Sequence, residues 1–147
     1  MRLRKFFSFR KPKIRTIRLK TQGEHYHLDQ IYEKINQHYF EGKLDLKISW
    51  FGNHKSVAKR RVILGSYNHR KGLIKIHRVL DHSHIPDYFI SFIVYHEMLH
   101  HVLPPLWGRY RRRRIHHSEF SAREKQFEEY ALAKEFRKGF IKELFKH

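Results

Sequence analysis

Two histidines and a glutamate stand together in the stretch Tyr95-His-Glu-Met-Leu-His-His-Val-Leu-Pro-Pro105. His96 and His100 are four residues apart, so on a helix their imidazoles share one face and can bind one tetrahedral ion. Glu97 projects about a quarter-turn away, which suits a general base that acts on a water molecule at the metal without binding the metal. The pattern HExxH is therefore typical of a zinc hydrolase. Because the chain holds 14 histidines, the pattern can also arise by chance.

A third metal ligand must come from elsewhere in the chain. A catalytic zinc commonly takes three protein ligands and leaves one position for water. The chain has no cysteine, so histidine or a carboxylate must supply the ligand. His101 points to another side of the helix than His100, which indicates a surface or supporting role. His116 and His117 follow a loop long enough to turn back, and the residues alone leave the choice between these two open.

The helix under the motif is bracketed by prolines. Pro86 suits the first turn of a helix and Pro104-Pro105 ends one, which predicts a helix over residues 87–103. This segment is apolar on nearly every side, so we expect a buried central helix. Three ionisable groups are costly to bury there, and a zinc ion would compensate all of them. The alternative is that the histidines are partnered core residues and Glu97 is a buried salt-bridge partner.

The residues before this helix predict one helix and a small sheet. Apolar residues at helical spacing predict a helix over residues 28–42. Strict alternation over residues 44–50 predicts a strand with one buried face. Two further strands, 62–67 and 73–78, flank a turn at 68–72, so we expect them to pair antiparallel.

The residues after the motif complete the fold prediction. An apolar stripe from Phe120 to Leu144 predicts one long C-terminal helix, with Ser121 and Glu124 as a capping box. The order of elements predicts an α+β fold in which a small, mainly antiparallel sheet packs on the central HExxH helix. A basic N-terminal arm, residues 1–23, precedes a single domain at 24–147.

The charge of the chain points to a polyanionic partner. Lys and Arg number 32 against 14 Asp and Glu, a net charge of +18 that makes nucleic acid the first candidate. No apolar run is long enough for a membrane span, and we expect a soluble protein in the cytoplasm or on DNA in the nucleoid or nucleus. One basic block lies between the second and third metal ligands, with Tyr110 available to stack on a base. The predicted nucleic-acid residues are Arg109, Tyr110, Arg111, Arg112, Arg113 and Arg114; the alternative is a solvated flexible loop.

The motif and its surroundings resemble a known family. HEMLH is followed, after a loop, by His116-His-Ser-Glu-Phe120, which resembles the HExxH and HGxxF-type segments of the SprT-like zinc metalloproteases, the family of the DNA–protein crosslink protease Spartan. Residues 36–50, Gly65 and residues 72–80 are similar to the segments that precede the active helix in that family. The resemblance covers about residues 28 to 140. His117 stands where the family usually has glycine, and the cysteine-rich zinc ribbon of many relatives is absent here.

The resemblance implies a zincin-like minimal SprT domain and a function. It implies one Zn²⁺ per chain held by His96, His100 and His116, with Glu97 as the catalytic base. It also implies an endopeptidase that acts on proteins bound to or crosslinked with DNA, whose strand at residues 73–78 aligns an extended substrate by strand addition. The alternative from another class is a basic nucleic-acid-binding protein with a structural or vestigial metal site. Glu97 favours the enzyme, because a structural site has no need of a carboxylate beside its first ligand.

Overall fold

The elements of the chain follow the order expected of an α+β protein. The computed structural model describes residues 16–55, 61–107 and 113–146. Its elements are α1 (Leu28–Phe40), β1 (Lys47–Phe51), β2 (Gly65–Asn68), β3 (Leu73–His77), the 3-10 turn η1 (Arg78–Leu80), α2 (Asp87–Val102), β4 (Leu106–Trp107), β5 (Arg113–Arg114), α3 (Ser118–Glu124) and α4 (Tyr130–Leu144). The predicted helices at 28–42 and 87–103 are confirmed as α1 and α2. None of the helices in the described ranges is long and apolar enough to cross a membrane.

The three-stranded sheet is mixed, whereas the sequence predicted a mainly antiparallel one. Its order is β1-β3-β2, in which β3 pairs antiparallel with β2, as expected, and parallel with β1. The burial pattern of β3 fits its central position, because Leu73, Ile74, Ile76 and His77 are buried on both faces of the strand. Strands β1 and β2 form the two edges, and β2 is half-buried.

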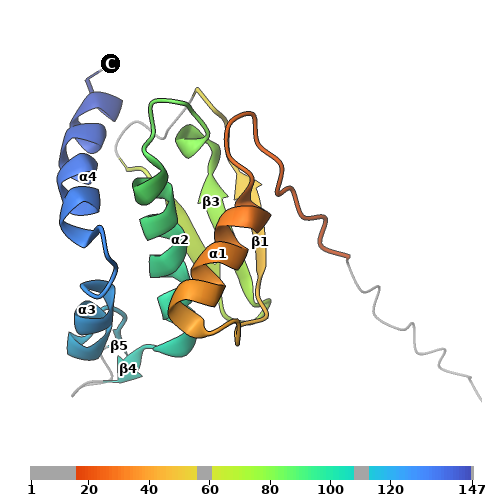
Figure 1. Ribbon diagram of the computed structural model, residues 1–147, viewed down its shortest axis with the longest axis vertical. Helices are drawn as coiled ribbons and strands as arrows, with labels where there is room; N and C mark the ends of the chain where they lie inside the picture. The colour runs from red at the N-terminus through yellow and green to blue at the C-terminus, as the bar shows by residue number, and fades with distance from the viewer. Residues whose placement is uncertain (1–15, 56–60, 108–112, 147) are drawn as a thin grey trace, which may run out of the picture.

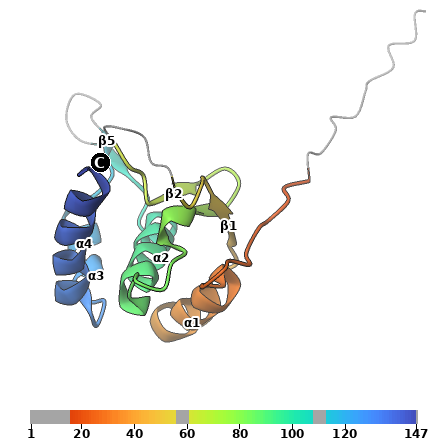
Figure 2. The same ribbon diagram turned by 90° about the horizontal axis from the view of Figure 1, so that it is seen from above.

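Three helices lie on one side of this sheet, and two of them, α1 and α2, contact its strands. Figure 2 shows α1, α2 and α4 side by side, with α2 in the middle, and Figure 1 shows the same order from the front. Helix α2 contacts β2, β3 and all three other helices. Phe89, Ile90, Val94, Met98 and Leu99 on α2 are fully buried. The expected central helix is therefore observed, and the HExxH motif lies in its C-terminal half.

The predicted long C-terminal helix is two helices. Phe127, between α3 and α4, is 5% exposed and stacks on Tyr39 with ring centroids 5.4 Å apart. Turning this side chain inward interrupts the helix, and the Phe127 N–H bonds to the Glu124 carbonyl in a tighter turn. The capping box at Ser121 and Glu124 is also wrong. Helix α3 begins three residues before Ser121, and the N-cap is His117, whose imidazole accepts from the Phe120 N–H.

The described part of the N-terminal arm lies along the sheet. The Trp50 N–H bonds to the Lys20 carbonyl at 2.8 Å, and the Lys20 N–H bonds to Ser49 Oγ at 2.9 Å. Thr21 accepts from the indole of Trp50 at 3.1 Å. This cover explains why Ser49 is buried despite the polar position that the strand pattern gives it. The arm's phenylalanines at positions 6, 7 and 9 lie outside the described residues.

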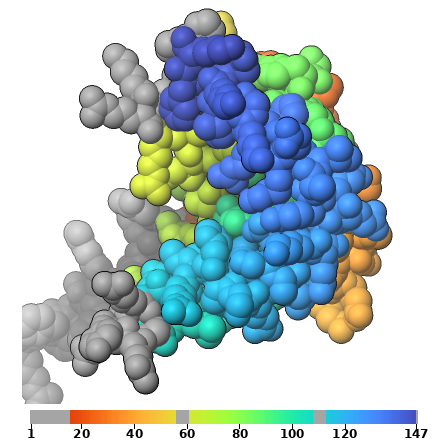
Figure 3. Space-filling model, turned by 90° about the vertical axis from the view of Figure 1, so that its left-hand side faces the viewer, coloured from red at the N-terminus to blue at the C-terminus, as the bar shows by residue number. Residues whose placement is uncertain are grey.

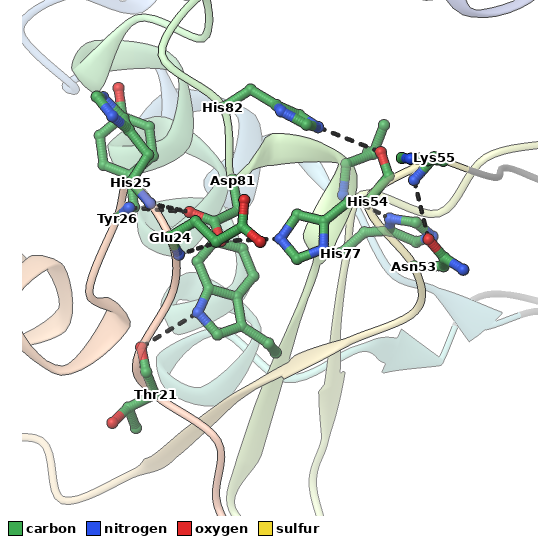
Figure 4. A network of polar contacts seen from close by, with 12 residues as sticks. Thr21, Glu24, His25, Tyr26, Asn53, His54, Lys55, His77, Asp81 and His82 are labelled. Carbon is green, nitrogen blue, oxygen red and sulfur yellow. Dashed lines mark hydrogen bonds and ion pairs between the residues drawn. The ribbon is translucent and has the colours of Figure 1, made fainter.

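Asp81 fixes this N-terminal segment to the rest of the domain. Its carboxylate accepts from the backbone N–H groups of Glu24, His25 and Tyr26, and lies 3.1 Å from Nε2 of His54 (Figure 4). Burial raises the pKa of Asp81, but these four partners outweigh it and hold the pKa at about 2. The charged carboxylate is therefore a structural link between chain segments that lie far apart in sequence.

Candidate metal centre

Three imidazoles meet at the end of α2. His96 and His100 lie one turn apart on this helix, and His116 lies just before α3. Nε2 of His100 is 3.2 Å from Nε2 of His96 and 3.2 Å from Nε2 of His116. Tetrahedral zinc with Zn–N bonds of about 2.0–2.1 Å holds its nitrogen ligands about 3.3 Å apart. The three nitrogens are thus placed to bind one metal ion together.

His116 and His117 have different roles in the structure. His116 joins the group of three, while His117 turns inward, is 6% exposed and caps α3 through its Nδ1. Its Nε2 is buried and finds no hydrogen-bond partner among the described residues. The His117 side chain is therefore accommodated as a helix cap and not in the group of three histidines.

Phe120 lies beneath the three imidazoles. It is 1% exposed, and its ring centroid lies 5.1 Å from that of His96 and 4.8 Å from those of His100 and His116. These apolar surroundings favour uncharged rings. Burial, followed by the charges of His96 and His116, lowers the pKa of His100 to about 4, and burial lowers the pKa of His116. Both rings are therefore neutral at neutral pH, which is the state that binds metal.

A carboxylate that the sequence interpretation missed supports the centre. Oε2 of Glu124 lies 2.7 Å from Nδ1 of His96, and the Glu124 side chain is 12% exposed. Burial alone would raise the pKa of Glu124. The hydrogen bond to His96, the charge of that ring and the charge of Lys134 together outweigh burial, so the pKa lies below its usual value. A carboxylate in this position fixes the ring of a metal ligand and strengthens it as a donor. The local pattern did not indicate this contact with His96, because it assigned Glu124 to a helix cap.

Glu97 lies beside the three histidines but outside their group. Its side chain is nearly buried against β2, where a Cβ added to Gly65 would be 3.0 Å from Oε1 of Glu97. Burial raises the pKa of Glu97 to about 7, although the charges of His96 and Arg137 lower it. A carboxyl group with this pKa can take up and return a proton near neutral pH. The predicted base is thus placed in a setting that suits proton transfer.

An open cleft of about 530 Å³ leads to these residues. In Figure 3 it is bordered by the segment 61–66, the segment 113–118 and helix α4. The edge strand β2 contributes Gly65, Ser66 and Tyr67 to its lining. The expectation that the strand at 73–78 aligns a substrate is wrong, because β3 is central and paired on both sides. Among the described strands β2 pairs with β3 alone, so its other edge is open within the described part of the chain, and β2 itself lines the cleft.

The other predicted residues lie around the cleft or outside the described chain. Arg109, Tyr110, Arg111 and Arg112 fall outside the described residues. Arg113 and Arg114 form β5, an exposed strand that pairs with β4, and Arg113 lines the cleft. The pairing puts Trp107 opposite Arg113, and Trp107 is 73% exposed. The sequence interpretation missed this tryptophan, although it stands at the start of the basic block.

His101 faces away from the metal group. Its Nδ1 lies 2.7 Å from the Tyr67 hydroxyl, so it joins α2 to the edge strand β2. This agrees with the expected supporting role and explains how the helix and the strand that line the cleft are held together.

Comparison with known proteins finds no matching family model, no similar curated protein and no similar solved structure. The function must therefore be inferred from the geometry and chemistry of the site. The features that carry most information are the three converging imidazoles, the carboxylate of Glu97 and the open cleft beside them.

Proposed function

We propose that this chain is a zinc-dependent endopeptidase of the SprT-like type. The observation that carries the proposal is the group of three histidines, in which Nε2 of His100 lies 3.2 Å from Nε2 of both His96 and His116, with Glu97 lining the same cleft. Three imidazoles are a donor set that suits zinc. Three protein ligands in an open cleft are typical of a catalytic zinc rather than a structural one, which is closed by four.

The chain's own residues supply the rest of the chemistry. When bound, zinc is a Lewis acid that polarises water and the scissile carbonyl. Glu97 takes a proton from the attacking water on its carboxylate and passes it to the leaving amine. Glu124 keeps the ring of His96 in the orientation that directs Nε2 to the centre. The free edge of β2 holds the main chain of an extended substrate by strand addition.

The proposed substrates are proteins bound to or crosslinked with DNA, which also places the enzyme on DNA. The net charge of +18 favours contact with phosphates. The pair of strands β4 and β5 adds an exposed Trp107 and an exposed Arg114, a combination suited to stacking on an unpaired base and to phosphate contact. This pair lies between the second and third histidines, so bound DNA would lie next to the cleft.

A second candidate function is nucleic-acid binding with a structural or vestigial metal site. The charge and the exposed Trp107 favour it as much as they favour a DNA-directed protease. It leaves Glu97 unexplained, because that carboxylate is costly to bury and a structural site does not need it. We therefore prefer the enzyme.

The test is cleavage of an unfolded protein substrate by the zinc-loaded chain, with and without single-stranded DNA. We expect Glu97→Gln to keep zinc and to lower kcat by a factor of about 10² to 10⁴, because it removes the general base. Glu33→Gln, an exposed change of the same charge on α1, is the matched control and should cleave normally. A zinc-loaded wild type that cleaves nothing would leave the binding protein as the better interpretation.

A further inference from the structure

The charges that line the cleft are nearly all of one sign. Arg61, Arg113 and Arg137 line it, and they come from the segment before β2, from β5 and from α4. All three side chains are exposed. Among the described residues that line the cleft, Glu97 is the one acidic group, and it is nearly buried. Three arginines from different parts of the chain thus line the same cleft as Glu97 and the three histidines.

These arginines have no carboxylate partner in the described part of the chain. The ion pairs found there involve lysines and histidines, and none includes Arg61, Arg113 or Arg137. The positive charge of Arg137 also affects the site, because it contributes to lowering the pKa of Glu97 and of His116. Three like charges around a hollow attract an anion, which would remove their mutual repulsion.

We infer that the cleft selects peptide segments with Asp or Glu next to the scissile bond, and that Arg61, Arg113 and Arg137 determine this preference. The inference rests on the proposed function. The three arginines share the cleft with Glu97 and with the free edge of β2, so they face the chain that is cleaved rather than a distant partner. A carboxylate has the opposite charge to a guanidinium group and can accept two parallel hydrogen bonds from it, whereas a lysine-rich segment would be repelled.

The test uses quenched fluorescent peptides that differ only in the residues on both sides of the cleaved bond, which are Glu, Gln or Lys. With the zinc-loaded full chain we expect kcat/KM to fall in the order Glu, Gln, Lys, with Glu ahead of Gln by at least about tenfold. Added salt should reduce this ratio. Arg137→Gln should bring the ratio of the Glu peptide to the Gln peptide toward one. Arg70→Gln, an equal loss of charge on the exposed turn between β2 and β3, should keep the wild-type ratio.

Several results separate this inference from the proposed function. Equal cleavage of the three peptides would overturn the charge preference and leave the protease intact. If the peptides show no charge preference and a single-stranded oligonucleotide inhibits their cleavage, the arginines bind nucleic acid instead, and the inference is wrong. If no peptide is cleaved, the protease proposal is wrong. The preference of the cleft for acidic peptides is then tested by measuring the binding of labelled peptides. Tighter binding of the Glu peptide by wild type than by Arg137→Gln would support it, and equal binding would overturn it.

Discussion

Oε2 of Glu124 lies 2.7 Å from Nδ1 of His96, although 28 residues separate them in sequence. Because one nitrogen of the ring is held by a carboxylate, the other is directed toward His100 and His116. Lys134 on α4 lies 3.7 Å from the second oxygen of Glu124. The candidate metal centre is thus supported by residues of α3 and α4 as well as by its three histidines.

Glu124→Ala should weaken zinc binding by about 10-fold to 100-fold, because it releases the His96 ring. Competition with a chromophoric chelator measures the affinity. Glu119→Ala, an exposed change on the same helix, is the control and should bind zinc as the wild type does. Unchanged affinity in Glu124→Ala would show that the contact does not support the metal.

Gly65→Ala should lower peptide cleavage while zinc stays bound. The new Cβ would lie 3.0 Å from Oε1 of Glu97 and 2.9 Å from Cγ2 of Ile93, so the carboxylate must move. We expect kcat/KM to fall by about tenfold to a hundredfold, since small displacements of a catalytic group have effects of this size. Gly139→Ala on α4, where a Cβ meets nothing within 4 Å, should leave cleavage unchanged. Wild-type kcat/KM in Gly65→Ala would contradict the placement of Glu97.

Local patterns predicted the part of the site that lies on one helix. Prolines and apolar residues delimit α2, and the spacing of His96, Glu97 and His100 places them on it. These features depend on residues that are neighbours in sequence. The strand positions and the turn before β3 follow from similar short-range signals.

Contacts between distant residues decide what the sequence could not show. Strand β3 is central because it pairs with both β1 and β2, and Phe127, where the C-terminal helix is interrupted, packs on Tyr39. His116 rather than His117 joins the metal group because the ring of His117 caps α3. Periodicity in a single segment carries no information on such partners.

Glu97→Gln should stabilise the zinc-free protein at alkaline pH. Burial raises the pKa of Glu97 from 4.5 to about 7, so between these values the folded chain holds a proton that the unfolded chain has lost. The free energy of unfolding therefore falls as the pH rises from 4.5 to about 7. Above that range the buried carboxylate is charged, and the full loss of stability is present. We expect Glu97→Gln to raise the free energy of unfolding at pH 8 by up to about 3 kcal/mol, with a much smaller gain at pH 5. Urea unfolding measures both, and equal stability of the two proteins at pH 8 would contradict the burial of a carboxylate.

Asp81→Asn should destabilise the fold by about 2 kcal/mol at pH 7. Four hydrogen-bond partners hold the pKa of Asp81 at about 2, below its usual 3.8, despite burial that raises it. The depressed pKa makes this contribution present above pH 3.8, and it is lost as the pH falls through about 2. Urea unfolding should therefore show a smaller acid dependence in Asp81→Asn than in the exposed control Asp45→Asn. Equal stabilities of the two variants at pH 7 would contradict the role of Asp81 as an anchor.

Metal content per chain, measured by elemental analysis after zinc loading and exhaustive dialysis, tests the central claim most directly. The account predicts about one zinc per chain in wild type and in His117→Ala, and loss of zinc in His116→Ala, because removing a ligand weakens binding more than removing its support. His117→Ala should lose only the cap of α3, about 1 kcal/mol of stability. A wild type without zinc, or zinc retained in His116→Ala and lost in His117→Ala, would contradict the three-histidine centre.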